Sequence, residues 1–386
     1  MFDWITRRGK AVERKTAHGL IAWQAPGRPV WTARDYAAFA RDGYGRNAVA
    51  HRCVRLIAEA AASAALRVGP ADHPLARLLA RPNPEQTGVE LMETFFGHLQ
   101  VSGNAYLEAA AFDDGEPREL FALRPDRVAI IPGARGWPVG WEYRLGATVR
   151  RYERDPLTDD APILHLKHFH PLDDWNGQSP MEAAAYAIDI HNAGGAWNKA
   201  LIDNAARPSG ALVYTGAGGA NRMGEEEFAR LKLEIDSALA GAANAGRPML
   251  LEGGLDWKPM SLSPTDMDFI EARHSAAREI ALAFGVPPML LGIPGDNTFA
   301  NYREANSAFW RQTVLPLAVK TARAVENWLG ARWPDAGFAS VSVDLDTIPA
   351  LASERDAVWA RLEAATFLTT EEKRRLAGVD APEVAQ

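Results

Sequence analysis

Three long helix-like segments, with a small mixed block after the first and a glycine- and proline-rich loop after the second, constrain this fold most. The first segment begins at Ser179, which is followed by Pro180 and, three residues after the cap, by Glu182, a combination typical of a helix N-terminus. The second covers residues 263–286, and the third starts near Asn301. Long helices on both sides of an inserted block add little to a compact globule. The order therefore favours a shaft with a module at its tip.

The block between the first two helices, residues 207–262, combines one helical pattern with short apolar runs. Residues 225–241 predict a helix, and the runs that predict strands are 210–215, 247–253 and 256–262. After the third helix, in which Pro316 predicts a kink, residues 338–346 predict another strand. The tail from Pro349 is predicted to be helical and acidic.

The loop between the second and third helices covers residues 287–300. Its prolines prevent either helix from continuing through it, and Gly292 and Gly295 add conformational freedom. It closes on the polar and aromatic run Asp296-Asn297-Thr298-Phe299.

Upstream of Ser179 the sequence alternates between helical and strand patterns. Residues 1–45 predict a basic, aromatic arm with little independent structure. Helices are predicted over residues 47–68, with Asn47 as the cap, over a short segment stopped by Pro82 and Pro84, and from residue 88 to a break at 102–104. A strand-rich module follows, with apolar runs at 105–112, 119–125, 128–133, 139–145, 148–153 and 163–169. The predicted fold class is α+β.

Composition excludes several classes of protein. The chain has 386 residues and one cysteine, Cys53, so neither an internal disulfide nor a cysteine-based zinc site can form, which fits a reducing setting. No run of about 18 apolar residues predicts a membrane span. The net charge is −7, and basic residues cluster only in the first fifteen positions, so a tight grip on a phosphate backbone is not expected. No GxxxxGK[ST] motif is present, so the chain is not itself a P-loop motor.

Three histidines in the run HLKHFH are the best candidates for chemistry. On a strand, His168 and His170 would share a face, and His165 would point the other way. A metal-dependent hydrolase would need further ligands, such as Asp173 or His191. The alternative is a half-buried strand beside a loop, in which Asp173 and Asp174 form a turn or cap the next helix, and this alternative is favoured.

An acidic run opens the helix of the mixed block. Glu225, Glu226 and Glu227 are typical of a first helical turn, where the helix dipole favours negative charge. A role in docking a partner, together with Arg230, is the less common reading.

The region REIALAFGVPPMLLGIPGDNTFANYREANSAFWRQTVLPL resembles the signature region of tailed-phage portal proteins of the HK97 type. Other blocks agree in order along residues 45–350: HPLARLLARPNPEQTG, SGNAYLE, ELFALRPDRV, ILHLKHFHPLDDWNGQSPMEAA and NAARPSGALVY. The compact, Ala/Arg-rich chain also resembles the portal of alphaproteobacterial gene transfer agents. Rival interpretations, a sequence-specific DNA-binding protein or a non-viral scaffold, lack such an ordered set of matching blocks.

The resemblance implies a dodecameric ring around a DNA channel and assigns a part to each segment. An N-terminal arm (1–45) precedes an α/β wing (46–178). Two stem helices (179–206 and 263–286) flank a βαββ clip (207–262). A tunnel loop (287–300), a long wing helix and strand (301–348), and a short crown (349–386) complete the chain.

The same resemblance implies a role rather than a reaction: double-stranded DNA passes through the ring at one capsid vertex without sequence-specific binding. It implies docking to the terminase large subunit, a head–tail adaptor and the major capsid protein, with assembly in the bacterial cytoplasm, and it implies no cofactor, metal or membrane. The DNA-facing residues it indicates are Ile293, Pro294, Gly295, Asp296, Asn297, Thr298 and Phe299.

Overall fold

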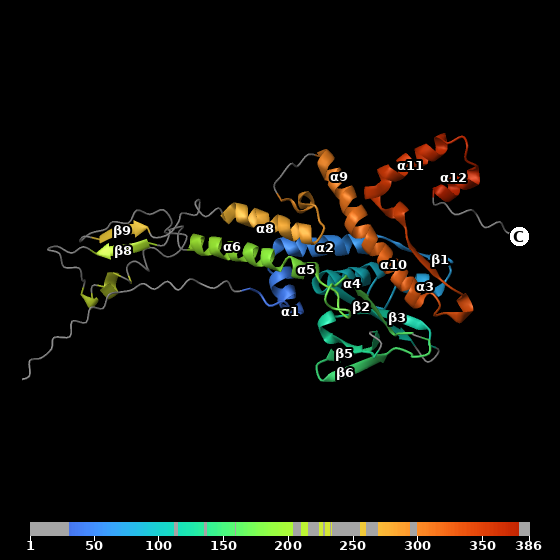
Figure 1. Cartoon of the computed structure of the whole chain (residues 1–386), viewed down its shortest axis with the longest axis horizontal. Coiled ribbons are helices and arrows are strands. Elements are labelled where there is room, and N and C mark those ends of the chain that lie inside the picture. The colour runs from blue at the N-terminus through green and yellow to red at the C-terminus, as the bar shows by residue number, and fades with distance from the viewer. Residues whose placement is uncertain are drawn as a thin grey trace, which may run out of the picture. The chain divides into compact units, whose positions relative to one another are not determined.

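The computed structural model describes residues 31–111, 115–134, 137–158, 160–203, 210–214, 224–226, 228–231, 233, 255–259, 269–293 and 299–377. Its helices and strands are shown in Figure 1. The chain combines helices with small antiparallel sheets, which confirms the predicted α+β class.

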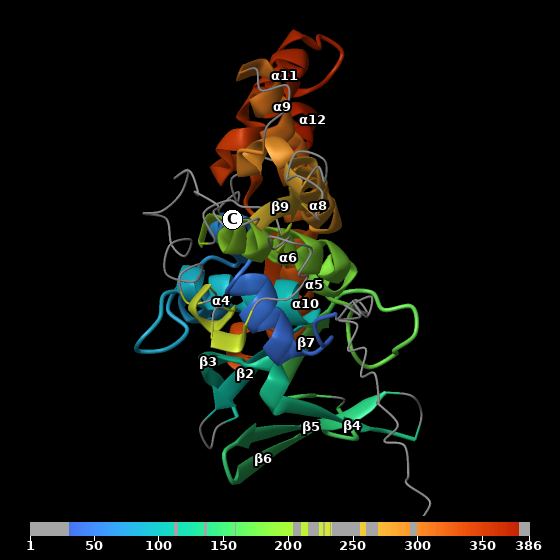
Figure 2. The same cartoon turned by 90° about the vertical axis from the view of Figure 1, so that its left-hand side faces the viewer.

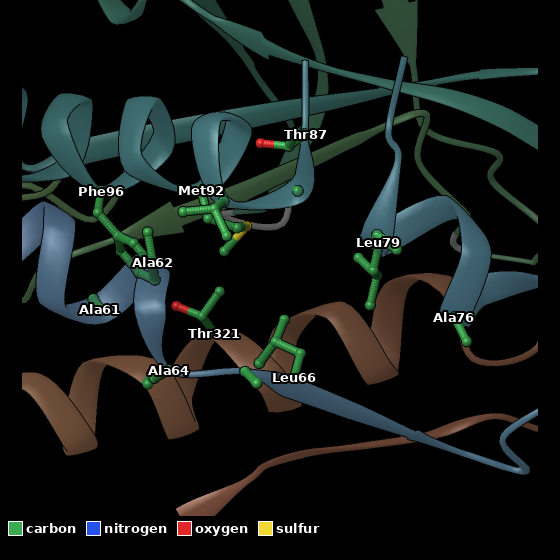
Figure 3. A pocket seen from close by; sticks show the side chains of 15 residues that line it. Ala61, Ala62, Ala64, Leu66, Ala76, Leu79, Thr87, Met92, Phe96 and Thr321 are labelled. Carbon is green, nitrogen blue, oxygen red and sulfur yellow. The ribbon is translucent and has the colours of Figure 1, made fainter. Parts of the chain in front are cut away.

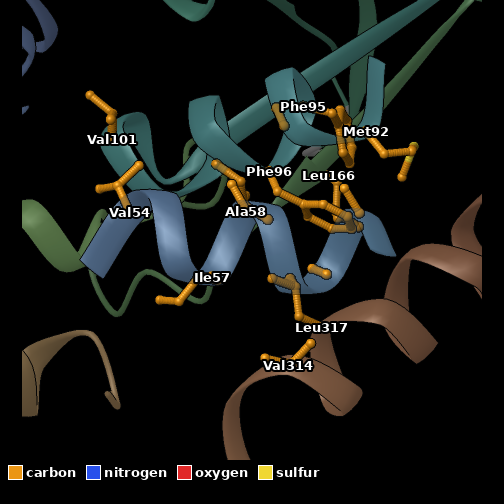
Figure 4. Packing of buried hydrophobic residues seen from close by; sticks show 14 of the residues in the cluster. Val54, Ile57, Ala58, Met92, Phe95, Phe96, Val101, Leu166, Val314 and Leu317 are labelled. Atoms are coloured by element: carbon orange, nitrogen blue, oxygen red, sulfur yellow. The ribbon is translucent and has the colours of Figure 1, made fainter. Parts of the chain in front are cut away.

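Three helices surround the main hydrophobic core: α2 (Ala48–Ser63), α4 (Gly88–Ser102) and α10 (Leu315–Leu329). Figure 4 shows Val54 and Ala58 of α2 facing α4, while Leu317 approaches α2 from the opposite side. The side chains of Phe95 and Phe96 are at most 1% exposed, so they form the centre of this core. Burial of such side chains contributes roughly 1.5–3 kcal/mol each.

The predicted cap of α2 is confirmed, but its predicted end is wrong. The Asn47 side-chain oxygen accepts hydrogen bonds from the backbone N–H groups of Val49 and Ala50. The helix ends at Ser63 instead of continuing to residue 68, and residues Leu66–Gly69 form strand β1. That strand pairs antiparallel with β10 (Ser340–Val343), a partner far away in the sequence. Non-local pairing has overridden the local helical pattern.

The elements before α2 and after β1 follow local signals. A short α1 (Tyr36–Ala38) runs into a π-helical turn η1 (Phe39–Tyr44), and α3 (Pro74–Ala80) ends before Pro82, as predicted. Thr87 and Glu90 form a capping box at the start of α4. The helix ends at Gly103, which has a φ of +78°, at the predicted break.

All six strands predicted upstream of Ser179 are present, and they divide into two antiparallel sheets of three. One has the order β3 (Pro117–Leu123), β2 (Asn104–Ala111), β7 (Ile163–Lys167). The other has the order β4 (Val128–Pro132), β5 (Pro138–Leu145), β6 (Thr148–Glu153), with the turn η2 (Pro125–Arg127) before β4. A second apolar cluster draws on both sheets through Tyr106, Leu123, Trp141, Tyr152 and Ile163.

The helix predicted from Ser179 is interrupted once. Ser179 Oγ accepts from the Met181 N–H, which confirms the cap, and α5 (Pro180–Ala183) is followed by α6 (Ala185–Asp203). Strands β8 (Gly210–Tyr214) and β9 (Leu255–Pro259) pair antiparallel, which confirms two of the three strands predicted in the mixed block. The third, at 247–253, lies outside the described residues.

The remaining elements run from the second long helix to the tail. They are α8 (Phe269–Ala283), the 3₁₀ turn η4 (Pro288–Leu291), α9 (Phe299–Phe309), the π-helical turn η5 (Trp310–Val314), α10, η6 (Pro334–Ala336), β10, η7 (Leu345–Thr347), η8 (Pro349–Leu351), α11 (Ala352–Ala364) and α12 (Thr370–Leu376). Pro316, where the sequence predicts a kink, lies in the first turn of α10, just after the π-helical turn η5. Such a turn accommodates a proline that has no N–H to donate. Within the described residues, no helix has the length and hydropathy to cross a bilayer.

Candidate channel loop and assembly surfaces

The end of α8 is fixed by a Schellman motif at Gly285. This glycine has a φ of +65°, and its N–H donates to the Leu282 carbonyl at 3.0 Å. The N–H of Val286 donates to the Ala281 carbonyl at 2.9 Å. These two bonds satisfy carbonyls that the helix leaves open and turn the chain sharply away from its axis.

The first half of the predicted loop is ordered and packed. After η4, Gly292 has a φ of +71°, and the Ile293 N–H donates to the Pro288 carbonyl at 3.3 Å. The Ile293 side chain is 7% exposed and packs with Ala277 of α8 and Val49 of α2. Ile293 was grouped with the DNA-facing residues, but in the single chain its side chain anchors the base of the loop.

The turn η5, which follows α9, is tied to the same helix end. Thr313 of η5 donates its hydroxyl to the Gly285 carbonyl at 2.6 Å. The chain resumes as helix α9 at Phe299, and the residues that lie outside the described ranges are Pro294, Gly295, Asp296, Asn297 and Thr298. The start of the predicted tunnel loop is therefore attached to the body of the fold.

The two predicted stem helices, α6 and α8, lie side by side (Figure 1). Gly194 of α6 allows a close approach, because a Cβ there would stand 3.0 Å from Cγ of Arg273 on α8. Nothing in the structure explains the second glycine, Gly195, in the same way.

Large apolar side chains on these helices remain exposed. Tyr186 is 51% and Ile190 45% exposed on α6, and Ile270 is 67% and Leu282 80% exposed on α8. A helix pair with apolar groups on its outer surfaces is suited to packing against further protein.

The predicted clip residues are only partly described. Glu225, Glu226 and Arg230 are exposed, and Glu227 lies outside the described residues. Exposure is compatible with a docking role for these side chains and also with a solvated helical face.

The side chain of Asn104, at the start of β2, joins three segments. Its Oδ1 accepts from the Gly177 N–H at 2.8 Å and lies 3.0 Å from Nε2 of His165. Because Oδ1 already accepts from a backbone N–H, the His165 Nε2 must be the protonated ring nitrogen. The sequence showed Asn104 only as part of a helix break, and its role depends on a partner 73 positions away.

Glycines make this junction possible. A Cβ on Gly103 would lie 2.4 Å from the Gly177 carbonyl oxygen, and a Cβ on Gly177 would lie 2.1 Å from that of Gly103. The His168 N–H also donates to the Gly103 carbonyl at 2.9 Å. Gly103 in the run SGN and Gly177 in the run NGQSP are the sequence features that correspond to this close backbone approach. Ser179 Oγ then donates to the Gln100 carbonyl at 2.8 Å, which fixes the start of α5.

The histidines do not assemble into a catalytic cluster. His165 stacks on Tyr106 with ring centroids 4.4 Å apart, and burial, followed by the nearby Lys167, lowers its pKa to about 3. Burial, followed by Lys320, lowers the pKa of His168 to about 4. His170 lies beyond the strand, and its Nδ1 accepts from the Leu172 N–H at 3.0 Å. These rings serve local structure.

The acidic pair forms the turn that the sequence favoured. Asp173 Oδ1 accepts from the N–H groups of Trp175 at 2.7 Å and Asn176 at 3.0 Å. Burial tends to raise the pKa of Asp173, but the hydrogen bonds from Asn176 and Trp175 outweigh it and lower the pKa. His191, the other proposed ligand, lies 3.2 Å from the amide nitrogen of Asn47. Among the described residues, no three His, Cys, Asp or Glu side chains gather as a metal site.

Comparison with known proteins gives a consistent result. The model of the phage portal protein family matches residues 48–378. A chain in the neck of an empty gene transfer agent particle, computed with C6 symmetry, is 53% identical, with 92% of this chain and 96% of that chain covered and a TM-score of 0.71. A chain in the native neck computed with C12 symmetry is 52% identical over the same shares, with a TM-score of 0.70.

A phage relative shows a more distant likeness. The portal protein of Enterobacteria phage HK97 is 27% identical over 295 residues, which are 72% of this chain and 66% of that protein. The match to the family model covers the chain from the start of α2 to the end of α12. The chain belongs to the phage portal protein family.

Proposed function

We propose that this protein is the portal of a gene transfer agent or a related phage-like particle. Twelve copies form a ring at one vertex of the capsid, and double-stranded DNA enters and leaves through the central channel. The observation that carries the proposal is the 53% identity, over 92% of the chain, to a chain in the neck of a gene transfer agent particle. The C12 symmetry used for the native neck supports the number twelve.

Exposed apolar side chains support assembly into a ring. Those of α6 and α8, such as Ile190, Ile270 and Leu282, are unburied in a single chain. A ring built from identical heterologous contacts can bury such surfaces between neighbours without leaving an open end.

The tunnel loop is the proposed contact with passing DNA. Its base, Gly285 to Ile293, is anchored to the body of the subunit by hydrogen bonds and by the burial of Ile293. Asp296, repeated in every subunit, would give the channel an anionic collar. Such a collar repels phosphates at close range, and weak contact suits a conduit through which DNA must move.

The remaining partners are proposed by family membership. The clip, with Glu225, Glu226 and Arg230 exposed, docks the terminase large subunit during packaging and a head–tail adaptor afterwards. The wing contacts the major capsid protein, and assembly takes place in the bacterial cytoplasm. The portal is a structural component, and the terminase supplies the energy of packaging.

The deciding experiment is negative-stain electron microscopy with a mass measurement in solution, on the protein alone and co-expressed with its capsid protein. We expect rings with a central channel and a mass near twelve times the 42.0 kDa of one chain. A chain that stays monomeric in both preparations would contradict the proposal.

A further inference from the structure

The loop between β7 and α5, residues 168–177, presents two apolar side chains to solvent. We call it the pre-α5 loop. Phe169 is 84% and Leu172 92% exposed, among the most exposed large apolar side chains in the described part of the chain. Exposure of this degree at two positions of one short loop indicates a contact surface rather than a scattered surface residue.

The pre-α5 loop is held in place by its own backbone contacts. Asp173 caps the turn through its bonds to Trp175 and Asn176. Nζ of Lys167 donates to the carbonyls of Asp174 and Trp175. With Gly177 held by Asn104, both ends and the centre of the loop are fixed. A surface that is already ordered loses little conformational entropy on binding.

A cavity of about 230 Å³ lies between α2, α3, α4 and α10, and we call it the α3 pocket. Figure 3 shows its lining, which is mostly apolar: Ala62, Leu66, Ala76, Leu79, Met92 and Phe96 are typical. The Thr321 hydroxyl in its wall already donates to the Leu317 carbonyl at 2.9 Å. A dry cavity of roughly 150 Å³ can hold a benzene ring, so this one can hold a phenylalanine side chain.

Charges near the two features are complementary. Arg77 and Arg81, next to pocket residues on α3, are exposed and form no ion pair with the described part of the chain. The pre-α5 loop carries Asp174, whose side chain is exposed beside Leu172. Opposite charges at the rim favour the correct pairing of two surfaces.

The two features lie on different flanks of α10. Ala318 lines the α3 pocket, while Lys320 donates to the Lys167 carbonyl at the base of the pre-α5 loop. Two residues apart on a helix, these side chains point about 160° apart around its axis. In Figure 2 the green segment before α5 projects to the right, and the blue segment around α3 projects to the left. Surfaces on opposite flanks of one chain can meet only between copies.

We propose that the pre-α5 loop of each subunit inserts Phe169 and Leu172 into the α3 pocket of the next subunit. The contact is heterologous, with a projection on one side and a pocket on the other, and repetition of it closes a ring. The inference rests on the proposed ring and adds the contact that joins its members.

Site-directed cross-linking tests this contact. The one native cysteine, Cys53, is fully buried and its pKa is raised to about 12 by burial, so it will not react. Val89 is 54% exposed at the α3 pocket and provides the second position. In assembled protein carrying Leu172→Cys and Val89→Cys, a short bismaleimide should give a ladder of covalent multimers. A mixture of the two single variants should give covalent dimers only.

Leu157→Cys with Val89→Cys is the matched control, because Leu157 is 94% exposed but lies in a different loop. No ladder is expected from it. Rings that form normally but give no ladder with the Leu172 pair would overturn the inference and leave the portal assignment intact. Absence of rings from every preparation would overturn both.

Truncation of the loop provides a second measurement. Phe169→Ala with Leu172→Ala should lower the association constant of the ring at least about tenfold, since apolar side chains in a pocket commonly dominate an interface. Leu157→Ala should leave assembly unchanged. Because all three side chains are exposed in the monomer, thermal unfolding of the monomer should not change. Equal assembly of the two variants would contradict the proposed insertion.

Discussion

The side chain of Asn104 joins segments that are far apart in the sequence. Its amide connects the end of α4, strand β7 through His165, and the loop that leads into α5 through Gly177. A buried polar contact therefore joins the segment before α5 to the sheet formed by β2 and β7. Polar networks of this kind are costly to break because every buried donor needs its acceptor.

Replacing Asn104 by Ala should destabilise the monomer by about 2 kcal/mol or more, since the Gly177 N–H and the His165 Nε2–H would both lose their acceptor in a buried place. Asn176→Ala is the control, because that amide donates to Asp173 at an exposed position. Urea unfolding at a concentration where the protein is monomeric measures both. An equal loss of unfolding free energy in the two variants would show that the buried contacts of Asn104 contribute no more than an exposed hydrogen bond.

Residue-scale prediction from the sequence succeeded where the partner was local. Asn47 and Ser179 cap their helices by accepting from backbone N–H groups two or three residues further along the chain. Both caps were identified from the sequence. Asn104 and Gly177 were not, because nothing in either local pattern indicates the other. The histidine run was ambiguous for the same reason, since stacking of His165 on Tyr106 depends on sheet register.

At the scale of elements, the base of the tunnel loop combines a helix end, a 3₁₀ turn and a π-helical turn. Gly285 is the point at which these meet: its carbonyl accepts from Thr313, and its positive φ directs the chain into η4. The backbone hydrogen bonds and the Thr313 contact therefore fix the end of α8 and the turn that follows it.

Gly285→Ala should cost about 1–2 kcal/mol for the left-handed backbone, plus a further loss because the new Cβ would lie 2.9 Å from Thr313 Oγ1. Gly292→Ala is a matched control: its φ is also positive, but no atom lies within 4 Å of the added Cβ. The difference between the two in denaturant unfolding isolates the contact with Thr313. A Thr313→Ala change should recover part of the loss at Gly285, and no recovery would contradict this account.

Elements were predictable to the extent that their signals are local. All six strands upstream of Ser179, the short helix before Pro82 and the capped helices follow from turn residues and periodicity. The division of the strands into two sheets could not be predicted from these signals, because it depends on which strands pair. The helix predicted to residue 68 was too long, since Leu66–Gly69 pairs with a strand near the other end of the chain. The burial of Ile293 depends equally on α2, which is distant in sequence.

For the whole molecule, assembly into a ring explains exposed apolar side chains that the single chain does not explain. Exposed Ile270 and Leu282 on α8, and Phe169 and Leu172 on the pre-α5 loop, are unfavourable in an isolated monomer. Assembly would remove them from water and make stability depend on protein concentration. The proposed collar belongs to the same scale, because one Asp296 carboxylate per subunit would form a collar only in a closed ring.

Asp296→Lys should therefore slow DNA packaging, because a ring of cations would hold the phosphates that a ring of carboxylates releases. The effect should be largest at low salt and should shrink as salt is added, since screening at physiological ionic strength acts beyond about 8 Å. Asp335→Lys, at an exposed position in η6, changes the net charge equally and should leave the rate unaltered. Nuclease-protected DNA per particle, followed over time, measures the rate. If Asp296→Lys and wild type package at the same rate in low salt, the collar has no influence on movement, and the loop would act through its shape alone.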